Sequence, residues 1–518
     1  MSLTQRLFQA LAHQPERIVV VDHRDDGTTG TWRAGDIRRA AVALARRLMA
    51  RRDPTSLTVV GIVAGNGAAT LIADLACLLA GVASLPLPLA FSRAQAEHLA
   101  QRCQLFLLDG RGALVLAERW GIEVGQAIRL DHPDYEGADF PFDAPPPPEQ
   151  RVCKIIHTSG TTSRPKGVML SERGIGAVVE ALEARLSAQL HTRYLSLVPF
   201  SLLLEQITGL YLPLLNGGTL HCLPASVPLL GESGAEPDRL LRWLVQVEPT
   251  FVAVPPVMIT RLQHHLQRGG ELAMALWRWL RGESAPYIAC GGAALATDTL
   301  EWLDRHGISV YQGYGLSENG SVVSVNAPGR NRIGSVGQPL DHAQVRIGEG
   351  GTIEVWSESL FLGYSGEDPS ACAMTPDGWL DTGDLGELDR DGFLYVYGRR
   401  KHVICLANGR NVCPERVELT LRSFPGVHDA VVFDDPDHGL VALLVYEPAL
   451  DRAALAAWSA GQFSDIERPS RFWLVEAGAA SLADCYTVTG RPRRAEIRTA
   501  YRQHIENRSH VHDLIVAV

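Results

Sequence analysis

The sequence lacks the features that mark several classes of protein. It has nine cysteines, but no CxxC pair, and no histidine lies at a spacing from them that is typical of a metal site. This pattern argues against a disulfide framework and indicates that the thiols are reduced. Its most apolar stretch, LIADLACLLAGVASLPLPLA, is interrupted by Asp74 and by proline and glycine, so it makes a poor membrane span. The N-terminus is typical of an amphipathic helix rather than of a signal peptide. These absences predict a cytoplasmic protein with no stable membrane insertion.

Positive charge is also scarce. The chain has 48 Lys and Arg residues against 58 Asp and Glu residues, a formal net charge of −10. Such a balance disfavours general nucleic-acid binding, although one local basic patch stays compatible with it. A composition of 46% hydrophobic and 20% charged residues is typical of a globular protein. At 518 residues the chain is long enough for two or more domains.

Strand-like and helix-like segments alternate in the first part of the chain. LTVVGIV (57–63) precedes an apolar helical pattern (66–81), and TFVAVPP (250–256) precedes another (257–270). This alternation predicts an α/β fold, with ligands at the carboxyl ends of parallel strands. From about residue 340 the segments become short strands and turns, which predict a β-rich subdomain. Beyond Arg399 the pattern predicts a compact α+β domain of roughly 120 residues.

One loop has the composition of a phosphate site. HTSGTTSRPKGVML (157–170) follows the apolar KII, so it is a strand-to-turn loop rich in glycine and hydroxyl groups. Backbone N–H groups, hydroxyls and one ammonium together suit a polyphosphate. It does not match the Walker A pattern, and the residues alone leave a flexible surface loop open. The candidate phosphate contacts are Thr158, Ser159, Gly160, Thr161, Thr162 and Lys166.

This loop resembles the phosphate-loop motif of the adenylate-forming (ANL) superfamily, which is also called the AMP-dependent synthetase and ligase family. Its members include acyl-CoA and aryl-CoA synthetases. QGYGLSEN (312–319) resembles the adenine and magnesium motif. The resemblance implies that Tyr314 stacks on the adenine, that Ser317 lies at the α-phosphate, and that Glu318 binds Mg²⁺. CGGAAL (290–295) resembles the segment beside the adenine, which implies roles for Gly291, Gly292 and Ala293.

Two further motifs follow in the family's order. WLDTGDLGELDRDGFLYVYGRR (379–400) resembles the ribose motif, which implies that Asp384 accepts from the ribose hydroxyls and that Arg399 assists. GRRKHVICLANGRNVCPERVE (398–418) resembles the start of the family's mobile C-terminal domain. The resemblance places the hinge at Lys401 and Gly409 at the pantetheine tunnel. It divides the chain into an adenylation domain (1–397), with a proline-rich seam at about 143–150, and a mobile domain (398–518).

The last family motif, roughly PxTxTGKxxR, is altered in this chain. The corresponding stretch is YTVTGRPRRAEI, which aligns Arg491 with the lysine that bridges carboxylate and α-phosphate during adenylation in the family. No lysine follows Lys401, so no displaced lysine takes this role. Arginine keeps the charge and can hold two oxygens at once. We expect Arg493, Arg494 and Arg498 to lie on the solvated face of the final helix.

The acyl pocket of the family is lined by segments that are apolar or small in this sequence. The predicted lining residues are Leu203, Val254, Met258 and Leu316. None of these segments contains a lysine or arginine that could form an ion pair with a second carboxylate of the substrate. We therefore expect the substrate to be an apolar monocarboxylate, either fatty or aromatic.

The resemblance as a whole implies an ATP-dependent carboxylic acid ligase with ATP and Mg²⁺ as cofactors. Its catalytic residues would be Lys166, Glu318 and Arg491. It would form an acyl-adenylate and transfer the acyl group to a thiol of CoA or an acyl-carrier protein; a basic face near Arg410 and Arg416 would favour the latter. The alternative is a protein that binds nucleotides or acyl-adenylates but has lost adenylation through Arg491.

Overall fold

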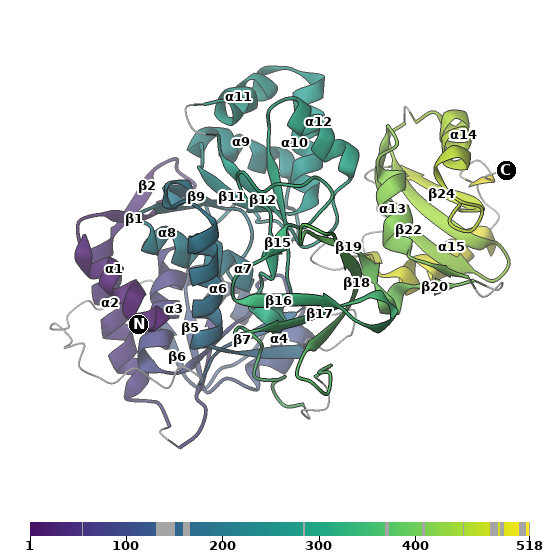
Figure 1. The fold of residues 1–518 in the computed structure, drawn as a ribbon. Helices are drawn as coiled ribbons and strands as arrows, with labels where there is room; N and C mark the ends of the chain where they lie inside the picture. The colour runs from purple at the N-terminus through teal and green to yellow at the C-terminus, as the bar shows by residue number, and fades with distance from the viewer. Residues whose placement is uncertain are drawn as a thin grey trace.

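Two sheets built mainly from parallel strands form most of the N-terminal domain (Figure 1). The computed structural model describes residues 1–53, 55–130, 151–158, 166–282, 285–367, 372–406, 410–448, 450–476, 485–486, 492–506 and 514–516. The nine-stranded sheet has the order β15 (Gln338–Pro339), β14 (Ser324–Val325), β13 (Val310–Tyr314), β12 (Tyr287–Cys290), β11 (Phe251–Val254), β9 (Arg193–Ser196), β10 (Thr219–Cys222), β1 (Ile18–His23) and β2 (Thr29–Arg33). Its middle strands, from β13 to β1, are parallel.

The second sheet has six strands and packs against the first through shared helices. Its order is β6 (Ala127–Arg129), β5 (Leu105–Leu108), β3 (Val59–Val63), β4 (Ala83–Pro86), β7 (Val152–Thr158) and β8 (Lys166–Ser171). One hydrophobic cluster joins side chains of both sheets with those of α1 (Leu3–His13), α2 (Ala34–Met49), α3 (Ala68–Ala80) and α6 (Glu172–Arg185). The apolar stretch that is too interrupted to span a membrane therefore forms a core helix, α3, and the buried strand after it.

Further helices cover the outer faces of the sheets. A second cluster joins the nine-stranded sheet to α9 (Pro237–Val247), α10 (Pro256–Arg268), α11 (Glu271–Leu280) and α12 (Thr297–Arg305). A third joins the six-stranded sheet to α4 (Arg93–Ala100) and α5 (Gly110–Leu114). Among the described helices, none is both long enough and apolar enough to cross a bilayer.

The last part of the chain is β-rich and then α+β. A four-stranded antiparallel sheet contains β16 (Ala343–Ile347), β17 (Thr352–Ser357), β18 (Leu380–Leu388) and β19 (Leu394–Arg399). After the short pair β20 (Ile404–Cys405) and β21 (Asn411–Val412), the final sheet contains β22 (Val427–Asp435), β23 (Gly439–Tyr446), β24 (Arg471–Glu476) and β25 (Leu514–Val516). Its helices are α13 (Pro414–Arg422), α14 (Arg452–Gln462) and α15 (Arg494–Glu506). The predicted fold class is confirmed, and the proline-rich seam lies outside the described residues.

A buried ion pair connects the two large sheets. The ammonium of Lys154, on β7, donates to the carboxylate of Asp74 on α3, and both residues are almost completely buried. Tyr211 ends η3 (Gln206–Tyr211), in the crossover between β9 and β10, and its hydroxyl donates to Asp74 Oδ2 over 2.6 Å. Ser84, on β4, accepts a longer hydrogen bond from Lys154. This buried cluster fixes β7 against both layers.

Breaking the pair should destabilise the protein far more than replacing it. Asp74→Ala leaves a buried ammonium without its carboxylate, which should cost about 3–5 kcal/mol. The apolar double variant Asp74→Leu/Lys154→Met removes both charges and should recover most of that loss. Thermal and urea unfolding followed by circular dichroism measures both variants. Equal destabilisation of the single and double variants would contradict this role of the pair.

Candidate functional site

The carboxyl ends of three neighbouring parallel strands form one edge of the nine-stranded sheet. Val254 is in register with Cys290, and Cys290 with Gln312, so β11, β12 and β13 end side by side. The turn after β12 holds the exposed Gly292 and Ala293. The turn after β13 is so tight that a Cβ on Gly315 would lie 1.8 Å from the carbonyl oxygen of Ser321. Only glycine fits there, and the turn directs Tyr314 and Glu318 to this edge.

Tyr314 and the ribose-motif residues lie together. The Tyr314 hydroxyl donates to Asp384 Oδ2 over 2.7 Å, and Nε of Arg399 lies 2.8 Å from Asp384 Oδ1. Asp384 and Arg399 face each other in register on β18 and β19. Burial and the charge of Asp384 raise the pKa of the Tyr314 hydroxyl well above its usual range, so it stays a donor. Three residues from two motifs about 70 positions apart thus form one polar group.

The short helix η4 (Ser317–Asn319) presents Glu318 and is anchored from beneath. Asn319 is fully buried, and its side-chain oxygen accepts from the hydroxyls of Ser357 and Ser359. The backbone N–H of Phe361 donates to the carbonyl of Glu318 over 2.9 Å. Ser317 is half-buried at the start of the same turn. The positions of Ser317 and Glu318 are therefore set by the β17 side of the domain.

The structure brings Lys166 close to Glu318 through one tyrosine. Lys166 begins β8; its Nζ lies 4.7 Å from the centroid of the Tyr364 ring and 2.8 Å from Glu367 Oε2. The Tyr364 hydroxyl donates to Glu318 Oε1 over 2.9 Å. Thr158 ends β7, opposite Lys166, and its side chain lies outside the described residues. Ser159, Gly160, Thr161 and Thr162 lie entirely outside the described residues.

The donor set around Glu318 fits a magnesium ion carried by a phosphate. Among the described residues, Glu318 Oε1 accepts from Tyr364 and Oε2 accepts no hydrogen bond. No group of three or more His, Cys, Asp or Glu side chains in the described parts of the chain forms a self-contained metal site. Mg²⁺ in nucleotide sites needs only one or two carboxylates, because phosphate and water supply the rest. Glu318 is the residue that would hold it.

The four predicted pocket residues divide between two hydrophobic clusters. Leu203 is 2% exposed and packs in the cluster between the sheets, against which Leu316 also packs. Val254 and Met258 pack in the cluster beneath α9 to α12. Successive strand residues point to opposite faces, so Ala253 rather than Val254 shares the cluster of Leu203. The structure therefore does not bring the four residues together.

Two other apolar side chains are exposed at this edge of the sheet. Leu202 is 37% exposed and follows β9, and Val257 is 52% exposed and follows the adjacent β11. Glu205, three residues beyond Leu202, is fully buried, and its carboxyl accepts from the hydroxyls of Tyr194 and Ser196. Burial raises the pKa of Glu205 to about 8 against these hydrogen bonds. Glu205 thus anchors the segment from inside.

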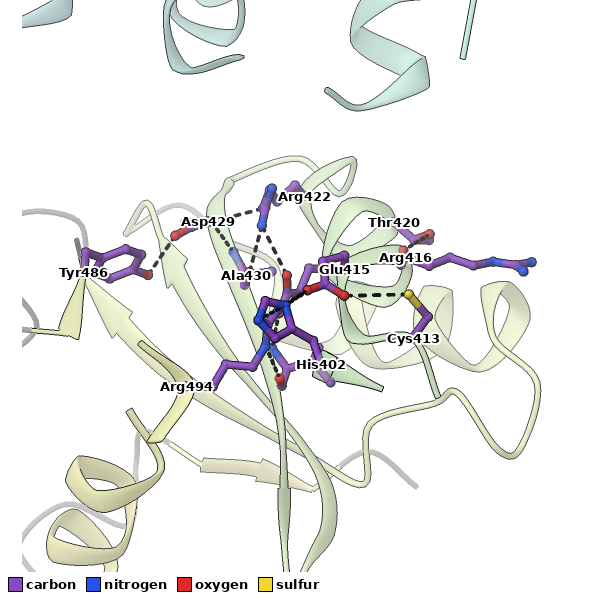
Figure 2. A network of polar contacts seen from close by, with 12 residues as sticks. His402, Cys413, Glu415, Arg416, Thr420, Arg422, Asp429, Ala430, Tyr486 and Arg494 are labelled. Atoms are coloured by element: carbon purple, nitrogen blue, oxygen red, sulfur yellow. Dashed lines mark hydrogen bonds and ion pairs between the residues drawn. The ribbon is translucent and has the colours of Figure 1, made fainter. Parts of the chain in front are cut away.

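The C-terminal domain holds an extended polar network (Figure 2). His402, next to the predicted hinge residue Lys401, donates to Glu415 over 2.5 Å. Arg494 contacts Glu415 at 3.2 Å and Glu418 at 2.6 Å. Burial would raise the pKa of Glu415, but the hydrogen bond from His402 and the charge of Arg494 outweigh it and lower that pKa.

This network corrects one expectation about the final arginines. The side chain of Arg494 is only 17% exposed, so its predicted place on the solvated helix face is wrong. Two carboxylates on α13 draw its guanidinium inward. Arg493 is exposed and the Arg498 side chain is 45% exposed, as expected. Arg491 and Gly409 lie outside the described residues.

Sequence reasoning missed Tyr364 and Glu367. Both lie in the segment 361–367, which pairs with β8 although about 200 residues separate the two in the chain. Arg102 was missed as well; it donates to the carbonyl of Ser365 over 2.7 Å and holds the same segment. No local spacing signals such a pairing, because it depends on how the β-rich part folds back onto the six-stranded sheet.

Known enzymes resemble this chain along most of its length. A 2-succinylbenzoate–CoA ligase from Bacillus licheniformis is 28% identical over an alignment of 459 residues that covers 82% of this chain and 89% of that enzyme. A feruloyl-CoA synthase from an Amycolatopsis species is 31% identical over 353 residues, 64% of this chain and 66% of that enzyme. A long-chain-fatty-acid–CoA ligase from Bos taurus is 28% identical over 374 residues, 61% of this chain and 49% of that enzyme.

Solved structures share the fold. An anthranilate CoA ligase in complex with anthranoyl-AMP superposes with a TM-score of 0.81 at 16% identity, covering 98% of both chains. The o-succinylbenzoate CoA synthetase of Bacillus subtilis, in complex with its acyl-adenylate intermediate, gives 0.75 at 23% identity, covering 95% of this chain and 97% of that one. The family model described as AMP-binding enzyme matches residues 7–364. The chain belongs to this AMP-binding family of adenylate-forming acid–thiol ligases.

Proposed function

We propose that the protein activates an apolar monocarboxylate with ATP and passes the acyl group to a pantetheine thiol. One observation carries the proposal: Lys166, on β8 of the six-stranded sheet, and Glu318, in η4 after β13 of the nine-stranded sheet, converge on Tyr364. An ammonium and a hard carboxylate oxygen at one point are the pair that a metal-bound triphosphate requires. Tyr314, Asp384 and Arg399 form the neighbouring polar group that would bind the nucleoside.

In the first half-reaction, the carboxylate oxygen of the acid attacks the α-phosphorus of ATP and pyrophosphate leaves. Catalysis is mainly positioning and stabilisation of developing charge. Lys166 and Arg491 would supply positive charge, while Glu318 would hold the Mg²⁺, which neutralises phosphate charge when bound. Thr158, Ser159, Gly160, Thr161 and Thr162 would surround the phosphates, with Ser317 at the α-phosphate. Gly291, Gly292 and Ala293 would lie beside the adenine.

In the second half-reaction, a thiol would attack the acyl carbon and release AMP. We propose that residues 1–397 form the adenylation domain and 398–518 the domain that reorients about Lys401, with Gly409 near the entering thiol. Such a movement excludes water in one step and admits a bulky acceptor in the next. CoA and an acyl-carrier protein remain the two candidate acceptors, and the names of the relatives above favour CoA.

The acid is proposed to be aromatic or fatty. The names of the relatives refer to 2-succinylbenzoate, to a feruloyl group and to long-chain fatty acids. Leu202 and Val257 are exposed apolar side chains beyond adjacent strands, and they suit an apolar acyl body. Leu203, Val254, Met258 and Leu316 would support this surface from behind.

Pyrophosphate release tests the function and separates two residues. The assay mixes the protein with MgATP and a panel of fatty, benzoic and cinnamic acids. Lys166→Ala removes charge that acts in the transition state, so kcat should fall about 10²-fold. Asp384→Ala removes a ground-state nucleoside contact and should raise the KM for ATP first. The control is Asp377→Ala, an exposed carboxylate paired with Arg346. Wild-type release in both site variants would refute the assignment.

Leu202, which is exposed, rather than its buried neighbour Leu203, should determine which chain lengths of the acid the protein accepts. Leu202→Trp adds bulk at an exposed position, so we expect at least a tenfold loss of kcat/KM for long acids and little change for short aromatic acids. Leu203→Trp overfills a packed core and should destabilise the protein by about 1–3 kcal/mol. A chain-length series and thermal unfolding check the two variants. An unchanged length preference in Leu202→Trp would place the acid elsewhere.

Arg491 decides between the ligase and a protein that only binds nucleotides. Arg491→Ala should lower acyl-adenylate formation about 10²-fold, the scale of one preorganised charge contact. Arg491→Lys should retain or raise activity, and thioester formation from supplied acyl-adenylate should change little in either variant. Arg493→Ala is the control, because Arg493 is exposed. Nucleotide binding without pyrophosphate release in the wild-type protein, across the whole acid panel, would favour the binding protein.

A further inference from the structure

We infer that Tyr364 is a positioning residue that holds the catalytic lysine and the magnesium-binding carboxylate in place and apart from each other. The inference rests on the proposed function, because it concerns Lys166 and Glu318. The Tyr364 ring offers its face to the Lys166 ammonium at 4.7 Å, and its hydroxyl donates to Glu318 Oε1 over 2.9 Å. One side chain therefore contacts both groups and neutralises neither.

The backbone holds Tyr364 in this place from both sides. Val168 forms a β-bridge with Tyr364. The N–H of Leu362 donates to the carbonyl of Met169 over 2.8 Å, and the N–H of Ser365 donates to that of Gly167 over 2.7 Å. On the other side, Phe361 holds the Glu318 carbonyl. The segment 361–367 is thus a strap between the strand of Lys166 and the turn of Glu318.

The chemistry of the two groups makes such a spacer necessary. A lysine and a glutamate that approach one triphosphate from neighbouring positions also attract each other, and a direct ion pair would mask both. The aromatic face stabilises an ammonium without removing its charge. A hydroxyl orients a carboxylate and leaves its second oxygen for a cation.

Glu367 completes the arrangement. Its carboxylate lies 2.8 Å from Lys166, and both side chains are partly exposed, at 35% and 42%. An exposed pair of this kind is weak and exchanges easily. A phosphate oxygen can therefore replace Glu367 as the partner of Lys166, while Tyr364 keeps the ammonium in place during the exchange.

Calorimetric binding of the non-hydrolysable α,β-methylene analogue of ATP tests this role. Each protein is titrated with the analogue once in the presence of Mg²⁺ and once in the presence of EDTA. The ratio of the two Kd values gives the gain from Mg²⁺, which is the factor by which the metal tightens nucleotide binding. Tyr364→Phe keeps the ring and loses only the hydroxyl, so binding in EDTA should stay within about twofold while the gain from Mg²⁺ falls about tenfold, as expected for a hydrogen bond to a charged group. Tyr364→Leu should also weaken binding in EDTA, because it loses the ring. Tyr395→Phe is the control, since that hydroxyl donates to Asp389, a carboxylate outside the candidate site.

A double-mutant cycle with Glu318→Gln shows whether the hydroxyl acts through Glu318. If it does, Tyr364→Phe should have no further effect on the gain from Mg²⁺ in the Glu318→Gln background. Additive losses, or a wild-type gain in Tyr364→Phe, would overturn the role of Tyr364 and leave the proposed function intact. A wild-type protein whose binding does not respond to Mg²⁺ would instead overturn the proposed function, and the inference with it.

Discussion

The buried pair between Lys154 and Asp74 is the constraint on which the site depends. Lys154 lies on β7, the strand that leads into the predicted phosphate loop. Its partner Asp74 lies on α3 and accepts a hydrogen bond from Tyr211, in the crossover between β9 and β10. A buried charge tolerates only a position where its counter-charge is within reach, because any displacement leaves it unpaired. The pair therefore fixes β7, and β7 fixes β8 by antiparallel pairing along its whole length. Lys166 takes its position from that pairing.

Backbone contacts of β8 fix the positions of the other residues of the site. The strap 361–367 joins β8 to η4, and this contact fixes the position of Glu318. Tyr314, four residues earlier, reaches Asp384 on β18. Each group is thus held by a strand or by a turn of fixed shape, which is the rigidity that charge stabilisation requires.

The chain has only three lysines, Lys154, Lys166 and Lys401, among 48 basic residues. Two of the three have structural environments that suit a compact ammonium: a fully buried carboxylate, and an aromatic face beside a carboxylate. Arginine serves where several acceptors must be held at once, as Arg494 does with Glu415, Glu418 and the carbonyl of Val432. A chain that uses arginine so widely makes Arg491, in place of the family's lysine, consistent with its general composition.

The described residues that flank Arg491 in the chain contact one another within the C-terminal domain. Tyr486 bridges to Pro492, and the N–H of Arg493 donates to the carbonyl of Cys485 over 2.7 Å. The Tyr486 hydroxyl donates to Asp429 over 2.7 Å, as Figure 2 shows. Arg494, at the start of α15, contacts Glu415 and Glu418 on α13, so described residues on both sides of 487–491 belong to the same polar network as His402, beside the predicted hinge.

The sequence by itself predicted the fold class, because strand–turn–helix order is a local property of the chain, and the resemblance of its motifs predicted the family. The same motifs singled out Lys166, Tyr314, Glu318, Asp384 and Arg399, whose roles stay predictions. Tertiary structure decided the rest. Alternate residues of β11 point to opposite faces of the sheet, so Val254 packs in another cluster than Leu203. Two carboxylates on α13 hold Arg494 in a mostly buried position. The strap places Tyr364 between Lys166 and Glu318. Each of these outcomes joins residues that are distant in the chain or depends on which face of an element meets the core, and neither is encoded in local spacing.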